Sequence, residues 1–353
     1  MQLPDQIAQH VEEGLLESMP IALDSSEVYL AGEQTYTFSM VFDDGMTNAP
    51  LPLEGVAWEV ENPAIAQVTA DGTVSCRSTG TTRVFAILPG GRKLQAVVVS
   101  DMSQAPQAWG VPVLAYHRVC ADFAKSRWYS DENLALSQSD FEEQLEWLEE
   151  NGYTTIGTND LYAWIKKGAY LPAKSVMLTF DDGFYETYHV VYPMLKKHRM
   201  KGVAFVVGSN IPATTLGYDY WGKHNARYMG WDAIDEIRRD YPELEIQSHS
   251  YDLHYRLKNR DGVATALSRD QVAADFALNE QLDATAFAHP FGQTTEAVRE
   301  VLEANPRMVL AFGYPMEYPA TRQSDCYNIP RYKIFGDGTI DDFAIAAMGG
   351  ARR

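Results

Sequence analysis

Two stretches of the sequence carry side chains of the types that activate water. Asp181 and Asp182 are adjacent, and His249 is followed five positions later by His254. One carboxylate and two imidazoles form a common metal-ligand set that leaves a position open for water. A second carboxylate beside such a set is free to take a proton. The residue types therefore indicate metal-assisted hydrolysis, provided that the fold brings the two stretches together.

Each stretch alone is a weak signal. Phe42-Asp43-Asp44-Gly45 repeats the acidic tetrapeptide in a different context, where it reads as a hairpin turn. A spacing of five places two side chains about 140° apart on a helix and on opposite faces of a strand. A loop that follows a strand end can aim both histidines at one point. Whether these residues can meet at one metal ion therefore depends on whether each stretch follows a strand.

From Val111 onward, strand-like runs alternate with helical patterns, which predicts parallel strands joined by helical crossovers. The predicted strands are Val111–Tyr116, Tyr153–Ile156, Val176–Phe180, Gly202–Val207, Leu244–Ser248, Thr285–Ala288 and Met308–Phe312. The predicted helices include Asn159–Lys167, Tyr188–Arg199, Trp231–Asp240, Gln271–Gln281 and Thr295–Asn305. This alternation fits a (β/α) barrel, with fewer than eight strands allowed. The acidic pair, His249 and His289 then follow strand ends, where such a barrel carries its chemistry.

One further helix is predicted from its termini. Ser139-Asp140-Phe141-Glu142 reads as a capping box with Ser139 as the N-cap. Phe141, Leu145 and Leu148 recur at helical spacing, and Gly152 stands where a C-cap belongs.

Residues 27–100 lack a helical period and predict an all-β sandwich of immunoglobulin size. The expected strands are Glu27–Leu30, Thr35–Phe42, Gly55–Val60, Thr73–Cys76, Arg83–Leu88 and Leu94–Ser100. Trp58 is expected to pack between the sheets. Residues 101–110 are polar, contain Pro and Gly, and read as a linker. Residues 1–22 are predicted to be an N-terminal extension with a short helix around Ile7–Ser18.

Composition excludes several classes of partner. The chain has 353 residues, 29 Lys+Arg and 48 Asp+Glu, for a net charge of −19, so a nucleic-acid partner is not expected. No apolar run reaches the ~18 residues of a membrane span. The three cysteines form no CxxC motif, and Cys120 with Cys326 is the most plausible pair to bridge. The N-terminus lacks a signal segment, so either the chain is cytosolic or a leader has been removed.

The motifs taken together resemble those of a known family. Thr179-Phe180-Asp181-Asp182-Gly183, His249-Ser250-Tyr251-Asp252-Leu253-His254 and Phe287-Ala288-His289-Pro290-Phe291-Gly292 occur in this order. They resemble the NodB-homology polysaccharide deacetylases, carbohydrate esterase family 4, over roughly residues 111–345. The five-residue histidine spacing is most similar to the branch that acts on the poly-N-acetylglucosamine of biofilms.

The resemblance implies a role for each matching residue. Asp181 matches the catalytic base, and Asp182, His249 and His254 match the ligands of a divalent metal ion, usually Zn²⁺. Phe291 matches the position whose backbone N–H helps to hold the oxyanion. The implied reaction removes N-acetyl groups from an N-acetylglucosamine-type polysaccharide. An O-acetyl esterase, a peptidoglycan deacetylase and a glycan-binding protein with weak or no catalysis remain alternatives.

The sequence departs from the family pattern at two places. The third motif has Ala288-His289 where members carry an arginine, and no histidine follows His289 to supply the usual general acid. His289 and His117 are the candidates for that acid. Arg331 is a candidate to pair with Asp181 and keep its carboxyl group ionised.

Residues 23–100 resemble the bacterial Ig-like group 2 repeat. The similarity lies in Trp58-Glu59-Val60-Glu61-Asn62-Pro63, Asp71-Gly72-Thr73-Val74 and Gly80-Thr81-Thr82. Such modules imply a secreted or cell-surface protein, and we expect this one to act as a spacer. The predicted order is thus an extension (1–22), an Ig-like sandwich (23–100), a linker (101–110) and a distorted, NodB-like (β/α) barrel (111–353).

Overall fold

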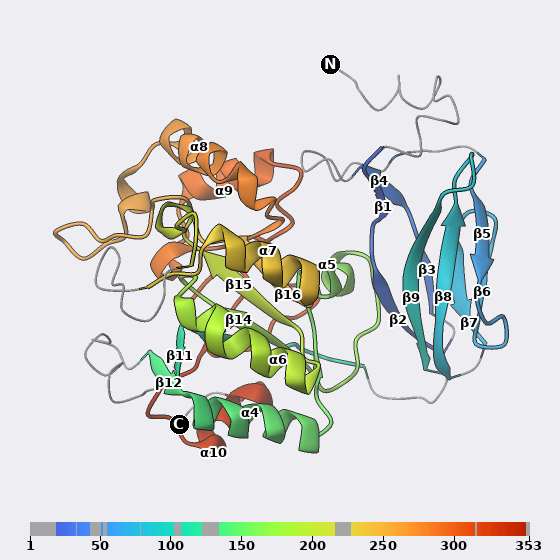
Figure 1. Cartoon of the computed structure of the whole chain (residues 1–353), viewed down its shortest axis with the longest axis horizontal. Coiled ribbons are helices and arrows are strands. Elements are labelled where there is room, and N and C mark those ends of the chain that lie inside the picture. Colours follow the sequence, from blue (N-terminus) through green and yellow to red (C-terminus); the bar gives the residue numbers. More distant parts are fainter. Residues whose placement is uncertain are drawn as a thin grey trace. The chain divides into compact units, whose positions relative to one another are not determined.

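The computed structural model describes residues 19–32, 34–42, 51, 55–77, 79–101, 107–121, 134–215, 227–314 and 316–350. The predicted helix around Ile7–Ser18, the Asp43-Asp44-Gly45 turn and most of the predicted linker lie outside these ranges. The chain divides into two compact units: Met1–Ala108 with Asn159–Ala173, and Trp109–Thr158 with Lys174–Arg353. Figure 1 shows the elements of each unit.

The first unit consists of β-sheets and the segment Asn159–Ala173. One sheet has the order β2 (Glu27–Ala31), β9 (Lys93–Asp101), β8 (Gly80–Ile87) and β5 (Ala57–Val60), and another has β3 (Thr35–Thr37), β7 (Thr73–Cys76) and β6 (Ala66–Val68). Strands β1 (Ile21–Leu23) and β4 (Met40–Phe42) form a separate antiparallel pair. Side chains from the two larger sheets share one core, against which Trp58 packs in a partly buried position.

The sequence predicted a single strand over Thr35–Phe42, and this is wrong. The run contains two strands, and β3 pairs with β7 while β4 pairs with β1. Between them, Phe38 N–H donates to Gly72 O over 3.1 Å, and Ser39 N–H donates to Asp24 Oδ1 over 3.1 Å. These bonds divert the chain from one sheet to the other, which an unbroken β-rich run cannot indicate.

The second unit is built on a parallel sheet. In the described part of the chain, eight strands form it in the order β18-β17-β16-β15-β14-β10-β19, and β13 also pairs with β14. Their bounds are β10 (Val113–Tyr116), β13 (Thr154–Thr155), β14 (Ser175–Phe180), β15 (Gly202–Val206), β16 (Leu244–Ser248), β17 (Ala286–Ala288), β18 (Leu310–Phe312) and β19 (Tyr332–Lys333). Strands β11 (Arg118–Cys120) and β12 (Ala135–Ser137) form a small parallel pair beside it.

The segment Ile329–Lys333 brings the two ends of this sheet together. Ile329 makes a parallel bridge to Phe312 at the end of β18, and β19 then pairs in parallel with β10. The sheet is therefore a distorted (β/α) barrel, as predicted, with a closing segment that includes Arg331. Parallel strands place their carboxyl ends at one rim.

Helices cover the outside of the barrel. They are α4 (Gln138–Glu150), α6 (Tyr192–His198), α7 (Trp231–Asp240), α8 (Arg269–Leu278), α9 (Glu296–Ala304) and α10 (Ile340–Ala347). Helix α5 (Thr158–Lys166) belongs, from Asn159 on, to the first unit. The helix predicted over Tyr188–Arg199 begins instead as a π-helical turn at Thr187–Val191 and continues as α6. Pro193 lies just after the π-helical turn, inside the continuous helical run, at a position where it has no N–H to donate.

The predicted N-cap of α4 is also wrong. Ser137, not Ser139, caps the helix, and its hydroxyl accepts a hydrogen bond from Asp140 N–H over 3.0 Å. Asp140 occupies the third helical position, so the sequence holds a second capping pattern two residues earlier. Gly152 does follow the helix with a positive φ of 69°.

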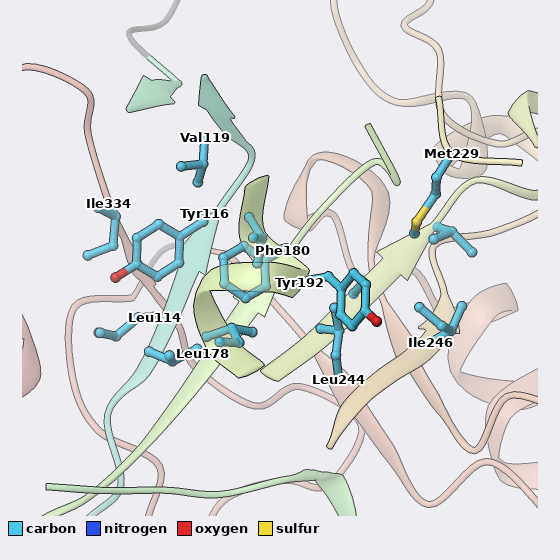
Figure 2. Packing of buried hydrophobic residues seen from close by; sticks show 14 of the residues in the cluster. Leu114, Tyr116, Val119, Leu178, Phe180, Tyr192, Met229, Leu244, Ile246 and Ile334 are labelled. Carbon is cyan, nitrogen blue, oxygen red and sulfur yellow. The ribbon is translucent and has the colours of Figure 1, made fainter. Parts of the chain in front are cut away.

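Apolar side chains between strands and helices form the barrel core (Figure 2). All six residues of β14 are buried, as expected for a central parallel strand. Phe180, its last residue, packs against the rings of Tyr116 and Phe141 at centroid distances of 5.2 and 5.8 Å. The residues that follow Phe180 are thus anchored by a rigid aromatic cluster.

We expect Phe180→Ala to reduce the free energy of unfolding by about 3–5 kcal/mol, because it leaves a cavity in this cluster. Leu278→Ala, at a side chain that is 59% exposed, is the matched control and should change stability by less than about 0.5 kcal/mol. Urea unfolding followed by near-UV circular dichroism measures both. Equal stability of the two variants would contradict the packing role.

Candidate active site

The acidic pair lies where β14 ends. Asp182 and Gly183 both adopt left-handed backbone conformations, with φ of 75° and 71°. A Cβ on Gly183 would approach Val206 Cγ1 to 2.8 Å, so the turn requires glycine there. Asp181 N–H donates to Tyr116 O of β10 over 2.9 Å. The sharp turn directs the two neighbouring carboxylates to different partners.

Asp181 faces Arg331 inside the barrel. The guanidinium donates from Nη1 to Oδ1 over 2.8 Å and from Nη2 to Oδ2 over 2.9 Å, and the two side chains are 1% and 3% exposed. Arg331 also donates to Gly313 O over 2.8 Å and to Thr179 Oγ1 over 3.2 Å. Burial alone would raise the pKa of Asp181, but Arg331, with His249 and His117, holds that pKa well below its usual range.

Asp182 faces the two histidines. Its Oδ1 lies 3.2 Å from His254 Nε2 and 3.6 Å from His249 Nε2, and the three ligand atoms all lie within 4.8 Å of one another. That oxygen is buried and accepts no hydrogen bond from the described residues. Because a buried anionic oxygen normally has a partner, this set fits a divalent cation with one carboxylate and two imidazole ligands.

The tautomer of His249 suits this use. Its Nδ1–H donates to Ala288 O over 2.8 Å, which leaves the Nε2 lone pair facing Asp182. Burial lowers the pKa of His249 to about 4, so the ring is neutral at pH 7. A second hydrogen bond of this kind commonly fixes the orientation of a metal-binding histidine.

Phe291 lies beside the same site, in the turn after β17. Its φ is 57° and that of Gly292 is 68°. Its ring packs against His254 at a centroid distance of 4.4 Å and beneath the guanidinium of Arg256 at 4.2 Å. Among the described residues, no backbone hydrogen bond from the Phe291 N–H is found. A Cβ on Gly292 would lie 2.2 Å from Tyr314 Cβ, so the turn has no room for a side chain at position 292.

The two candidate proton donors differ in their surroundings. His289 is 1% exposed, and its Nε2 bonds with Tyr327 O over 2.9 Å, while burial lowers its pKa to about 4. Burial also lowers the pKa of His117, but the carboxylates of Asp181 and Asp182 act in the opposite direction. His117 is thus electrostatically coupled to the acidic pair.

These residues line one cavity of about 280 Å³. Its walls are His117, Arg118, Leu134, Asp181, Asp182, Phe184, His249, His254, Arg256, His289, Phe291, Gly292, Tyr314 and Arg331. Every site residue proposed from the sequence is in this set. Arg118, Arg256 and Tyr314 were not singled out, although Arg118 directly follows His117 and Arg256 lies two residues after His254.

Comparison with known proteins agrees with this geometry. Residues 168–309, which include the acidic pair, both metal-site histidines and Phe291, match the family model described as polysaccharide deacetylase. A poly-beta-1,6-N-acetyl-D-glucosamine N-deacetylase of Staphylococcus aureus strain MSSA476 is 27% identical over 241 residues, or 64% of this chain and 78% of that protein. The chain carries a polysaccharide deacetylase domain of the NodB type, as its motifs predicted.

Solved structures show the same fold. IcaB from Ammonifex degensii aligns with a TM-score of 0.55 and 24% identity, over 69% of this chain and 99% of that one. The Streptococcus pyogenes deacetylase PplD, solved in complex with acetate, aligns with a TM-score of 0.55 and 20% identity, over 67% and 98% of the two chains. None of the helices in the described ranges has the length and apolar character needed to cross a membrane. The described cysteines form no disulfide, so the Cys120–Cys326 bridge is absent from this structure.

The buried ion pair yields a prediction about stability. Arg331→Met should destabilise the protein by about 3–5 kcal/mol at pH 7, because Asp181 is left buried without its cation. In the wild type the lowered pKa of Asp181 gives stability that is present above the unfolded pKa, about 3.9, and is lost as the pH falls toward the folded pKa. In the variant, burial raises that pKa, so protonation relieves the penalty.

The difference in free energy of unfolding between the wild type and Arg331→Met should therefore become smaller from pH 7 to pH 4, as measured by denaturant unfolding. Combining Arg331→Met with Asp181→Asn should recover part of the lost stability. If the loss of stability relative to the wild type is the same at both pH values and in the double variant, the burial of the charged Asp181 does not depend on Arg331.

Proposed function

We propose that the protein is a metal-dependent hydrolase that removes N-acetyl groups from an extracellular or cell-surface polysaccharide of the N-acetylglucosamine type. The observation that carries this proposal is the meeting of Asp182, His249 and His254 beside the Asp181–Arg331 pair in one cavity. The names of the relatives support the substrate class. We propose Zn²⁺ as the ion because the ligands are two imidazoles and one carboxylate.

Asp182, His249 and His254 would hold the ion. When bound, a divalent cation lowers the pKa of water toward ~7 and polarises a carbonyl group. Asp181 takes the proton of the attacking water, while Arg331 fixes the orientation of its carboxylate through two hydrogen bonds. Phe291 N–H donates to the acetyl oxygen as negative charge develops there.

The leaving nitrogen also needs a proton. We propose that His117 supplies it, because this histidine lines the cavity beside the acidic pair. Burial lowers the pKa of His117, and the Asp181 and Asp182 carboxylates oppose that lowering. His289 suits this role less, because its Nε2 is bonded to Tyr327 O and burial keeps its pKa at about 4. The bond between carbonyl carbon and nitrogen then breaks, and the products are acetate and a free amine on the sugar.

For residues 23–100 we propose a bacterial Ig-like group 2 spacer, on a protein that acts outside the cell or at its surface. The shared core of the two larger sheets and the motifs around Trp58 support this assignment. Because no residue of 23–100 lines the cavity, we give this unit no part in the chemistry.

Two single substitutions test how the site divides its work. Asp181→Asn should lower kcat by at least about a hundredfold yet retain the metal, because it removes the base and spares the ligands. His254→Ala should lose the metal, because only two ligands remain. Metal analysis of the purified proteins together with acetate release measures both effects. Equal metal loss in the two variants would contradict the assignment of Asp181 as the base.

The substrate is tested separately. We expect acetate release to be fastest from oligomers of β-1,6-linked N-acetylglucosamine, compared with chito-oligosaccharides, peptidoglycan fragments and acetylated xylan. Removal of the metal with a chelator should abolish release, and added Zn²⁺ should restore it. Faster release from acetylated xylan would favour an O-acetyl esterase, whereas metal binding without release from any polymer would favour a glycan-binding protein.

A further inference from the structure

Helix α8 presents a buried acid that the proposed chemistry does not use. Asp275 is 7% exposed, and its carboxylate accepts two backbone hydrogen bonds. Tyr251 N–H donates to Oδ2 over 2.8 Å, and Asp252 N–H donates to Oδ1 over 2.7 Å. Both amides lie in the loop that joins His249 to His254. Asp275 therefore accepts hydrogen bonds from the backbone between His249 and His254.

The C-terminal end of α8 also makes a hydrogen bond to the residue before this loop. Asn279 follows Asp275 by one helical turn, at the C-cap of α8, and is 6% exposed. Its Nδ2 donates to Ser248 Oγ over 2.9 Å. Ser248 directly precedes His249, so two buried polar side chains from one helix region hold the loop at two points.

The chain after β15 also binds the loop. Gly208 N–H donates to Ser250 O over 3.0 Å, and Ser209 N–H donates to Tyr251 O over 2.8 Å. A Cβ on Gly208 would lie 2.1 Å from Asn279 Oδ1, so these supports are closely packed. The loop is thus held by hydrogen bonds from two separate segments of the chain, α8 with its C-cap and the turn after β15.

The loop needs this support because its backbone is strained. Ser250 has a φ of 75°, which a residue with a side chain seldom adopts without external contacts. A charged acceptor makes a stronger hydrogen bond than a neutral one, and the carboxylate of Asp275 satisfies two successive N–H groups at once. An apolar or amide side chain could not do the same.

We propose that Asp275 is a positioning residue that holds the loop from His249 to His254 in its metal-binding shape before the ion arrives. This inference rests on the proposed metal site. Asp275 touches neither ligand ring, and it acts by fixing the backbone that carries them. Its contribution is preorganisation, which is measured as metal affinity.

Asp275→Asn is the direct test, because an amide oxygen can accept one of the two N–H groups while its NH₂ opposes the other. In the full chain, competition of Zn²⁺ with a chromophoric chelator should show at least a tenfold weaker affinity than the wild type. Asp270→Asn, on the same helix with a 94% exposed side chain, is the matched control and should change the affinity less than twofold. At saturating Zn²⁺, Asp275→Asn should recover most of kcat with an unchanged KM.

A second measurement does not require the variant to fold. In the metal-free wild-type chain, the amide protons of Tyr251 and Asp252 should be protected from hydrogen exchange. Exchange of both at the rate of an unstructured peptide would overturn the inference. So would a Zn²⁺ affinity of Asp275→Asn within twofold of the wild type. A wild-type chain that binds no Zn²⁺ would overturn the proposed function as well.

Discussion

Two adjacent carboxylates at the buried end of a strand are the constraint on which this site depends. The side chain of Asp181 is 3% exposed and that of Asp182 is 13% exposed. Like charges repel strongly where water is excluded. The left-handed turn at Asp182 and Gly183 separates them, so that each carboxylate meets its own partner. Asp181 is neutralised by Arg331. Asp182 lies beside two imidazoles, and its Oδ1 accepts no hydrogen bond from the described residues, an arrangement that could hold a cation.

The first of these partners depends on how the barrel closes. Arg331 lies in the segment that bridges β18 and β10, more than a hundred residues along the chain from Asp181. Its guanidinium bonds to Thr179 on β14 and to Gly313 after β18 as well as to the carboxylate. Closure of the sheet and neutralisation of the Asp181 carboxylate therefore depend on the same segment. A change that opened this segment would leave a buried charge unpaired.

The sequence predicted those parts of the fold that follow from local pattern. The bounds of α7 and β16 agree residue by residue. A strong helical period defines the helix, and Leu244 and Ile246, which alternate with polar residues, define the strand. The strand ends also placed the acidic pair and the histidines at one rim. Predictions failed where two local patterns competed, as at the cap of α4, or where tertiary hydrogen bonds interrupted a β-rich run, as at Phe38 and Ser39.

The supports of the site were harder to predict than its chemistry. Arg256, Tyr314 and Asp275 come from loops or helix faces whose relation to the site depends on the closed barrel, and none lies in a distinctive motif. Asp275 in particular stands in an ordinary helical stretch, where an acidic residue normally reads as a solvated side chain. Its burial and its two backbone partners become visible only once α8 is placed beside the loop that follows β16.

The protonation states of these groups favour cation binding at neutral pH. The pKa of Asp181 is depressed and that of His249 is about 4, so both are deprotonated well below pH 7. A cation that enters the Asp182 site therefore need not displace a proton from His249, which removes a common competitor for metal ions. The pairing with Arg331 makes Asp181 a weak base, however. In the proposed mechanism it can accept a proton from water only if the acidity of that water is itself increased, so the depressed pKa of Asp181 makes the proposed metal ion a requirement of that mechanism.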